Sequence, residues 1–233
     1  MTGSWTGHRT SPHLLPLLDA GVDRGLPYLV MPVVEGPSLQ RQQAPLAPDQ
    51  VRRIGAAAAA AGALAYIHGR GILHRDITPG NILLDRRDGV FLTDFGIAKA
   101  WDGPDLTAEN LIPGTLGYLA PEQAEGRGAS AASDVYALGL VLLEALTGVR
   151  EYSGTPLERA FAAVRRSPRI PSTLGEMWCS TLRRMTTRDR IKRPTAAEVR
   201  ALLSGRAETA DEAVSACHPA VGVSLAAHLG LAG

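Results

Sequence analysis

One stretch of the chain constrains its fold more than any other. Residues 72–84 place an acid, Asp76, and an amide, Asn81, on a short loop that leads directly into an apolar, strand-like run. A second acid, Asp94, follows another strand-like run, and Gly96 allows the chain to turn sharply just beyond it. Carboxylate and amide oxygens suit Mg²⁺, and a carboxylate can also accept the proton of an attacking hydroxyl. The sequence therefore predicts a metal-assisted site built on loops.

Three short motifs in this region resemble those of eukaryotic-type (Hanks-type) protein kinases. The loop from His74-Arg75-Asp76 to Asn81 is similar to the catalytic loop of that family, Asp94-Phe95-Gly96 to its metal-binding turn, and Ala120-Pro121-Glu122 to the end of its activation segment. One triplet would be weak evidence, whereas three in the family's order and spacing are strong. Ala98-Lys99 and Gln123-Ala124 beside these motifs resemble the bacterial serine/threonine kinases.

The resemblance implies an α+β fold that is mainly helical: a kinase C-lobe with an incomplete N-lobe that holds only the family's fourth and fifth strands and the hinge. We expect a disordered start at residues 1–10, the N-lobe remnant and hinge at 11–39, the C-lobe at 40–205 and a tail of undefined structure at 206–233.

Local patterns predict individual elements. A buried strand is expected at Tyr28–Met31 after a turn at Val22–Pro27, and a hairpin from the strand-like runs 82–84 and 90–93. Helices are expected from Pro48 through an alanine-rich run to about His68, from Ala132 to about Thr147, at Pro156–Arg166, at Met177–Thr186, and after Arg193-Pro194-Thr195 to about Leu203.

The catalytic residues that the resemblance implies are Asp76, Thr78 and Asn81. Asp76 would orient and deprotonate the substrate hydroxyl, while Asn81 and Asp94 would hold Mg²⁺ between the phosphates of ATP. Thr78 stands where serine/threonine kinases usually carry a lysine that meets the transferred phosphate. Threonine can donate a hydrogen bond but brings no positive charge.

The adenine of ATP would meet the segment that resembles the kinase hinge. Met31 would lie beside the base, the backbone of Pro32 and Val34 would meet its edge, Ser38 would reach the ribose, and Leu83 would form the floor. Taken alone, these residues equally indicate an ordinary β-hairpin followed by a turn.

Regulatory roles are also implied by the resemblance. Arg75 would bind a phosphate on the activation segment, for which Thr107 is the candidate acceptor; Glu109 could supply a permanent carboxylate instead, and the residues leave this choice open. Thr115 would hydrogen-bond toward the catalytic aspartate, which marks a preference for serine and threonine substrates.

Three further residues would hold the fold together. By resemblance, Glu122 pairs with Arg193, and Asp134 ties the start of the central helix to the catalytic-loop backbone. On general grounds Asp134 could also be an N-terminal helix cap, and Arg193 could be an ordinary surface residue.

Some parts of a kinase have no counterpart in the sequence. No Gly-x-Gly-x-x-Gly loop precedes Ser11, and the only lysines are Lys99 and Lys192, so the lysine that grips the α- and β-phosphates has no candidate, nor has the glutamate that orients it. We therefore expect a chain truncated in the N-lobe, with impaired activity. The alternatives are a pseudokinase-like binding or scaffold protein, or a non-functional product of a truncated gene.

The composition limits the partners and the cell compartment that we expect for the chain. The net charge of +1 indicates no strong attraction to nucleic acid. The start of the chain is polar rather than signal-like, and the apolar runs are too short or interrupted to predict a transmembrane segment. Two distant cysteines, Cys179 and Cys217, fit a reducing cytoplasm, with membrane association left open for longer relatives. The expected partners are ATP and a protein substrate with a serine or threonine acceptor.

Overall fold

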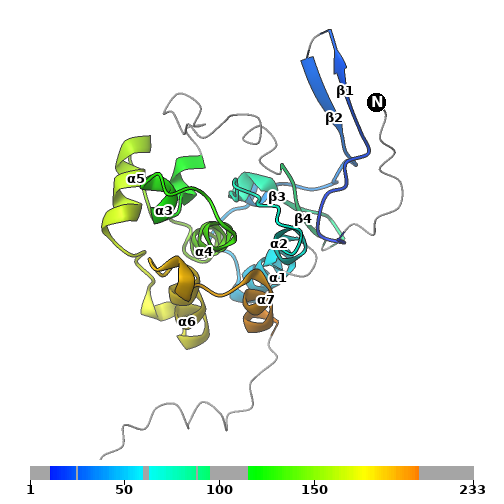
Figure 1. The fold of residues 1–233 in the computed structure, drawn as a ribbon. Coiled ribbons are helices and arrows are strands. Elements are labelled where there is room, and N and C mark those ends of the chain that lie inside the picture. Colours follow the sequence, from blue (N-terminus) through cyan, green and yellow to red (C-terminus); the bar gives the residue numbers. More distant parts are fainter. Residues whose placement is uncertain (1–10, 25, 60–62, 88, 95–114, 205–233) are drawn as a thin grey trace, which may run out of the picture.

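The computed structural model of the 233-residue chain describes residues 11–24, 26–59, 63–87, 89–94 and 115–204. Within these residues, seven α-helices form the larger body and two antiparallel hairpins lie at one side of it (Figure 1). The predicted α+β, mainly helical fold is confirmed in this described part. No described helix combines the length and the apolar character that crossing a membrane requires.

Each sheet is a two-stranded antiparallel hairpin. Strand β1 (Asp19–Asp23) pairs with β2 (Leu26–Val30), with Asp19 opposite Val30, and β3 (Ile82–Leu84) pairs with β4 (Val90–Leu92), with Ile82 opposite Leu92. The turn predicted at Val22–Pro27 is wrong in its extent. Val22 pairs with Pro27 inside the ladder, and the chain reverses at residues 24–25, where Arg24 has a φ of 51°.

The helices largely match the expected positions. They are α1 (Pro48–Ala59), α2 (Leu64–His68), α3 (Pro121–Ala124), α4 (Ala131–Thr147), α5 (Pro156–Arg165), α6 (Glu176–Met185) and α7 (Ala196–Leu203), with short 3₁₀ turns η1 (Leu39–Arg41), η2 (Pro79–Asn81), η5 (Thr115–Tyr118), η6 (Ser172–Leu174) and η7 (Arg190–Lys192). The single helix expected from Pro48 to His68 is wrong. Ala63 has a φ of −119° and a ψ of −91°, which are not helical, and α2 begins after it. Ala63 is fully buried, so packing overrides the high helix propensity of alanine.

Helix α4 is the centre of the core. Thirteen of its 17 residues are buried, and Figure 1 shows the other helices arranged around it. Ser130 caps its start, because the Ser130 hydroxyl accepts a hydrogen bond from the Ser133 N–H, and Gly148, at a φ of 73°, ends it in the left-handed conformation.

Extended segments flank the second hairpin on both sides. The Leu92 N–H donates to the His13 carbonyl at 2.8 Å, and on the other side the Leu84 N–H donates to the Pro37 carbonyl at 3.0 Å. The hairpin β1–β2 continues beyond these segments and projects away from the helical body (Figure 1). The loop of residues 72–81 thus lies where the β3–β4 hairpin meets the helical body.

Candidate active site

A buried carboxylate on α4 holds the catalytic-type loop in place. The two oxygens of Asp134 accept hydrogen bonds from the N–H groups of His74 and Arg75, each at 2.9 Å, and one of them lies 2.9 Å from the Nε2 atom of His68. Asp134 is 2% exposed. Because Ser130 is the helix cap, the Asp134 side chain is available to reach the loop, so of the two roles considered for it the structure shows the tie to the loop.

The imidazole of His74 joins this loop to the end of β4. Its Nε2 lies 3.0 Å from the Thr93 carbonyl, and its Nδ1 lies 3.3 Å from the Asp76 N–H. These partners assign the proton to Nε2, since a carbonyl can only accept and an N–H can only donate. Burial lowers the pKa of His74 below its usual value, which outweighs the opposing influence of nearby acids such as Asp134. A neutral imidazole therefore fixes Asp76 relative to Thr93.

The side chains of Asp76 and Asn81 are directly joined. The Asn81 amide nitrogen donates to the Asp76 carbonyl at 2.8 Å and to the Asp76 Oδ2 atom at 3.0 Å. The other carboxylate oxygen, Oδ1, is buried and has no hydrogen-bond partner among the described residues. A buried carboxylate oxygen without a partner is costly, so this atom is a candidate contact point for a bound molecule.

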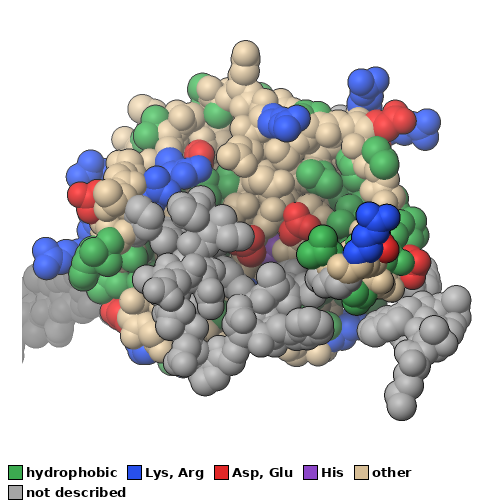
Figure 2. Space-filling model, turned by 90° about the horizontal axis from the view of Figure 1, so that it is seen from above, with side chains coloured by type: hydrophobic (Ala, Val, Ile, Leu, Met, Phe, Trp, Pro, Cys, Tyr) green, Lys and Arg blue, Asp and Glu red, His purple; other side chains and the backbone are tan. Residues whose placement is uncertain are grey.

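Asp94, which follows β4, lies near Asp76 and Asn81. The Thr93 N–H donates to the Asn81 carbonyl at 3.0 Å, and Asp94 follows at a φ of 56°, a left-handed conformation that aspartate tolerates better than most residues. Its side chain is exposed, and it acts electrostatically on His74 together with Asp76. The structure thus brings Asp76, Asn81 and Asp94 together. Figure 2 shows acidic side chains gathered beside a histidine at the middle of this face.

The residues expected around adenine lie along the neighbouring edge. Ser38 forms an antiparallel bridge with Leu83, and the Thr93 hydroxyl lies 3.9 Å from the sulfur of Met31. Pro32 and Val34 are half-buried, and the Val34 carbonyl accepts the Gly36 N–H at 2.9 Å. The connection approaches β3 so closely that a Cβ on Gly36 would lie 1.8 Å from the Leu84 carbonyl oxygen, so only glycine fits there.

The structure describes the remaining predicted residues to different extents. Thr78 is half-buried, and its carbonyl accepts the Asn81 N–H at 3.1 Å. Arg75 is exposed, has a φ of 65°, and borders a small hollow together with Asp76 and Tyr118. Thr115 begins η5, although its side chain lies outside the described part, and Thr107 and Glu109 lie wholly outside the described residues.

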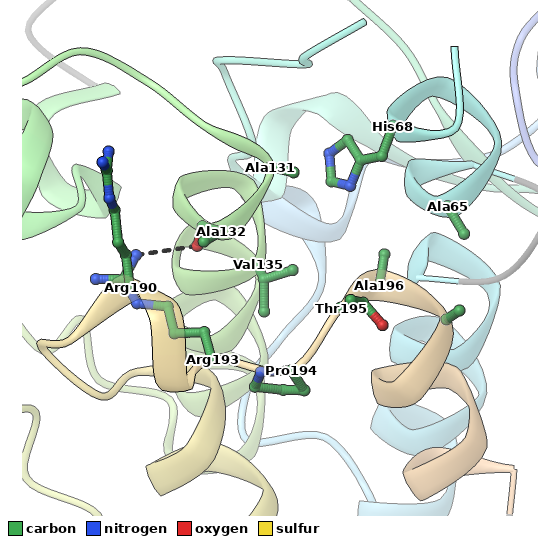
Figure 3. Close-up of a pocket in the computed structure, with 11 residues that line it drawn as sticks. Ala65, His68, Ala131, Ala132, Val135, Arg190, Arg193, Pro194, Thr195 and Ala196 are labelled. Carbon is green, nitrogen blue, oxygen red and sulfur yellow. Dashed lines mark hydrogen bonds between the residues drawn. The ribbon is translucent and has the colours of Figure 1, made fainter. Parts of the chain in front are cut away.

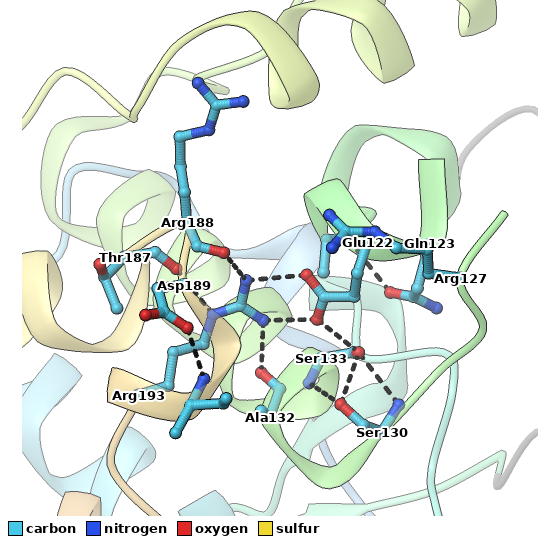
Figure 4. A network of polar contacts seen from close by, with 12 residues as sticks. Glu122, Gln123, Arg127, Ser130, Ala132, Ser133, Thr187, Arg188, Asp189 and Arg193 are labelled. Atoms are coloured by element: carbon cyan, nitrogen blue, oxygen red, sulfur yellow. Dashed lines mark hydrogen bonds and ion pairs between the residues drawn. The ribbon is translucent and has the colours of Figure 1, made fainter. Parts of the chain in front are cut away.

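Glu122 and Arg193 form a bidentate buried ion pair (Figure 4). The two guanidinium nitrogens Nη1 and Nη2 of Arg193 lie 2.6 and 2.8 Å from the two Glu122 oxygens, and the remaining donors reach the carbonyls of Ala132, Thr187 and Arg188. All the donors of this guanidinium are therefore satisfied, as a buried charge requires.

The ionisation of Glu122 follows from these contacts. Burial opposes the charged form, but hydrogen bonds from Arg193 and from the Ser133 hydroxyl, which lies 2.8 Å from Oε1, outweigh it and hold the pKa of Glu122 below its ordinary value. The pair ties the start of α3 to the turn before α7, and Ser133 links it to α4.

Sequence reasoning missed several residues that complete the site. His68 contacts Asp134, and Ser133 contacts Glu122. The Tyr118 hydroxyl donates to Glu144 at 2.7 Å beside the loop. Burial raises the pKa of Tyr118, so this phenol stays protonated. Each is a single polar residue whose partner is distant in sequence, so no local spacing pattern signalled it.

An apolar cavity lies behind the loop (Figure 3). It has a volume of about 340 Å³ between α2, the start of α4 and the start of α7. Small side chains such as Ala65, Ala132 and Ala196 line it, and His68 lies at its edge. The cavity is separate from the acidic cluster, because the Asp134 contacts lie between the two.

Comparisons with known proteins agree with the order of the motifs. The family profile described as a protein kinase domain matches residues 6–202. The chain is similar to the serine/threonine-protein kinase PkaA of Streptomyces coelicolor, with 37% identity over 80% of this chain and 35% of that protein. It is also similar to the serine/threonine-protein kinases PknB and PknD of Mycobacterium tuberculosis: identity is 40% over 76% of this chain and 30% of PknB, and 38% over 70% of this chain and 24% of PknD. The chain thus spans about a quarter to a third of the length of these relatives.

Proposed function

Because this chain belongs to the protein kinase family, as a serine/threonine kinase of the bacterial Hanks type, we propose that its site transfers a phosphoryl group from ATP to serine or threonine hydroxyls of a protein. The observation that carries the proposal is the free oxygen of Asp76. One oxygen is held by Asn81 at 3.0 Å, and the other is buried without a partner among the described residues.

Asp76 is the proton acceptor in this proposal. A substrate hydroxyl that donates to Oδ1 would complete the hydrogen bonding of this carboxylate and would be aimed for attack. Asn81 restricts the rotation of the carboxylate, and the His74 contact to the Asp76 N–H fixes its backbone. The loop therefore supplies orientation, which is most of what phosphoryl transfer asks of a protein.

The donor set near Asp76 fits Mg²⁺. The Asn81 amide nitrogen is committed to Asp76, which leaves its amide oxygen as a ligand, and the exposed carboxylate of Asp94 is the second. Within the described ranges, no three acidic, histidine or cysteine side chains cluster for metal binding. Mg²⁺ commonly takes its other ligands from phosphate and water. When bound, Mg²⁺ would neutralise charge on the phosphates.

The nucleotide base would lie along the edge formed by Met31, Ser38 and Leu83. The Ser38–Leu83 bridge and the Met31–Thr93 contact support this placement, because they set these residues beside the acidic cluster. Pro32 lacks an N–H, so its carbonyl alone could meet the base, whereas Val34 could offer its N–H.

We also propose that these 233 residues bind ATP weakly and transfer phosphate slowly by themselves. The sequence contains no lysine before Lys99, and Thr78 adds no charge beside Asp76. Losing several charge-assisted hydrogen bonds, each about 1.5–3 kcal/mol, lowers affinity by orders of magnitude. The same observation favours a second candidate, a pseudokinase-like binding protein that retains the acidic cluster.

A kinase assay on the purified chain distinguishes the two candidates. ATP, Mg²⁺ and a protein substrate should give slow incorporation of phosphate that Asp76→Asn and Asp94→Ala abolish, whereas Asp23→Asn, an exposed acid on β1, leaves it unchanged. Incorporation that survives Asp76→Asn would reject Asp76 as the acceptor. If neither the parent chain nor any variant transfers phosphate, and ATP still binds in an Mg²⁺-dependent way, the chain is better described as a pseudokinase-like binding protein.

Regulation through Arg75 is part of the same proposal. Arg75 is exposed beside the hollow that Tyr118 borders, which suits an arginine that receives an anionic group from the activation segment. If Glu109 supplies that group, Glu109→Ala should increase protease cleavage of residues 95–114 while Thr107→Ala does little. The reverse ranking would favour phosphorylation of Thr107.

A further inference from the structure

The end of α6 and the residues around η7 carry a concentration of basic side chains that the proposed chemistry does not use. Residues 165–200 contain ten arginines and lysines against three acidic residues. Because the net charge of the whole chain is only +1, the remaining residues are negative on balance. The molecule is therefore electrically polar although its overall charge is small.

The density of charge is highest at the end of α6 and around η7. We define the cationic tip by its exposed residues Arg183, Arg184, Arg188, Arg190, Ile191 and Lys192. The only acid in this stretch is Asp189, which accepts the Ile191 N–H at 3.1 Å and lies 3.9 Å from the Lys192 amine. Glu198, on the facing end of α7, is held by the Thr195 N–H and hydroxyl at 2.7 and 2.8 Å.

The four arginines of the cationic tip have no ion-pair partner among the described residues. Arg190 is exposed and also borders the apolar cavity (Figure 3), and Figure 4 shows Arg188 extending away from the network that its carbonyl joins. The Arg193 guanidinium holds the backbone just before η7, because it donates to the carbonyls of Thr187 and Arg188. Of these groups only Arg184 faces an acid among the described residues, because Glu198 interacts with it electrostatically. Exposed guanidinium groups without a close carboxylate favour an anionic partner.

Ile191 decides which kind of anionic partner fits. It stands between Arg190 and Lys192 and is 87% exposed. One exposed apolar residue is unremarkable, but an apolar side chain at the apex of a cationic turn matches a surface that is anionic outside and apolar beneath. A soluble polyanion would use the arginines and leave Ile191 in water. We propose that the cationic tip docks onto an anionic lipid surface, with Ile191 entering the boundary between headgroups and acyl chains.

The position of the cationic tip is compatible with an accessible active site. In Figure 1, α6 and α7 lie at the end of the molecule opposite the hairpin β1–β2. A membrane beneath α6 and η7 would therefore leave Asp76, Asn81 and Asp94 open to a protein substrate.

Vesicle binding by the full chain tests the proposal. Sucrose-loaded vesicles of phosphatidylcholine with phosphatidylserine should co-sediment the chain, and pure phosphatidylcholine vesicles should not. Each basic residue near such a surface contributes about fivefold in affinity, so Arg188→Gln, Arg190→Gln and Lys192→Gln together should weaken binding by about a hundredfold. The matched control replaces Arg24, Arg86 and Arg87, three exposed arginines on the two hairpins, by glutamine and changes the net charge equally. It should bind as the parent chain does.

The apolar residue is tested separately. Ile191→Ser should weaken binding to the anionic vesicles by about tenfold, while Val149→Ser, at an exposed position of the helical body (66% exposed), should not change it. Both side chains are exposed, so folding is not at risk. Equal losses with the two charge variants, or no loss with Ile191→Ser, would overturn lipid docking. Binding to a single-stranded oligonucleotide or a polyglutamate that is as tight as vesicle binding would assign the surface to a soluble polyanion instead.

Discussion

The hairpin β1–β2 and helix α4 are both rich in apolar residues, yet they bury them to opposite extents. Leu138, Leu142 and most other apolar residues of α4 are fully or almost fully buried, whereas Val22 and Leu26 of the hairpin are 70% and 72% exposed. A central helix is covered by neighbours all around, but an isolated two-stranded sheet has no second layer to cover its faces. Burial is therefore set by the number of covering elements more than by composition.

The two regions differ in polar contacts as well. The start of α4 supplies Ser133 to Glu122 and Asp134 to the loop at residues 74–75, with distances of 2.8–2.9 Å. Among the described residues of the hairpin, the one side-chain hydrogen bond is local: the Ala20 N–H donates to Asp19 Oδ1 at 2.9 Å. The residues proposed for proton transfer are thus held by the well-packed region, and the residues proposed for the base lie next to the poorly packed one.

Hydrogen exchange should give the largest contrast between these regions. Amides of Tyr28, Leu29 and Val30 should exchange orders of magnitude faster than those of Val135–Leu146, because the hairpin can open locally while α4 opens only with the whole body. Mass spectrometry on peptides from the two segments measures this directly. Equal protection would show that the hairpin is covered in solution.

Breaking the buried ion pair should have the largest effect on stability. Arg193→Met leaves the Glu122 carboxylate, 2% exposed, without its counter-charge, and should lower the free energy of unfolding by about 3–5 kcal/mol. Denaturant unfolding measures the change. Arg183→Met, an exposed arginine on α6, is the control and should change it by less than about 0.5 kcal/mol. A loss for Arg193→Met as small as for the control would contradict the buried pair.

The same substitution, leucine to alanine, compares the contribution of the two regions to the free energy of unfolding. Leu142→Ala, fully buried in α4, should cost about 2–5 kcal/mol of unfolding free energy. Leu26→Ala, 72% exposed in β2, should cost less than about 0.5 kcal/mol. Similar losses at both positions would mean that the hairpin packs against something in solution.

Acid should destabilise the helical body in two stages. The pKa of His74 is lowered from 6.5 by burial, so the unfolded chain binds more protons, and stability falls as the pH drops below about 6.5. The pKa of Glu122 is held below 4.5, so the stability that its ionised form contributes is present above that pH and is lost as the pH falls through the lowered pKa. Each unit of difference corresponds to about 1.4 kcal/mol. Unfolding midpoints measured from pH 7.5 to 3.5 check this, and His74→Gln should flatten the first stage only.

Local sequence patterns predicted the elements that depend on local information. The apolar run and Gly148 predicted α4, and Arg193-Pro194-Thr195 predicted the start of α7, because propensity and capping act over a few residues. The interruption at Ala63 escaped prediction, since a buried tertiary position decided it against local propensity.

The sequence led to the residues of the candidate site but not to the contacts between them. The order of motifs led to Asp76, Asn81 and Asp94, and the structure places them together. The free Oδ1 of Asp76 and the tautomer of His74 depend on atomic geometry that no spacing encodes. The proposed roles of these residues stay predictions until the assays are done.

The bonds from Asp134 to the N–H groups of His74 and Arg75 join positions 60 and 59 residues apart in the chain. Closing a loop of that length costs conformational entropy before any contact rewards it, so these bonds form only when α4 docks against the loop. The left-handed turn at Arg75, with a φ of 65°, then has no local reason to persist without them. The geometry of the candidate site is therefore a product of long-range folding. A partly folded form that keeps its helices but releases α4 would lose this geometry before it loses its secondary structure.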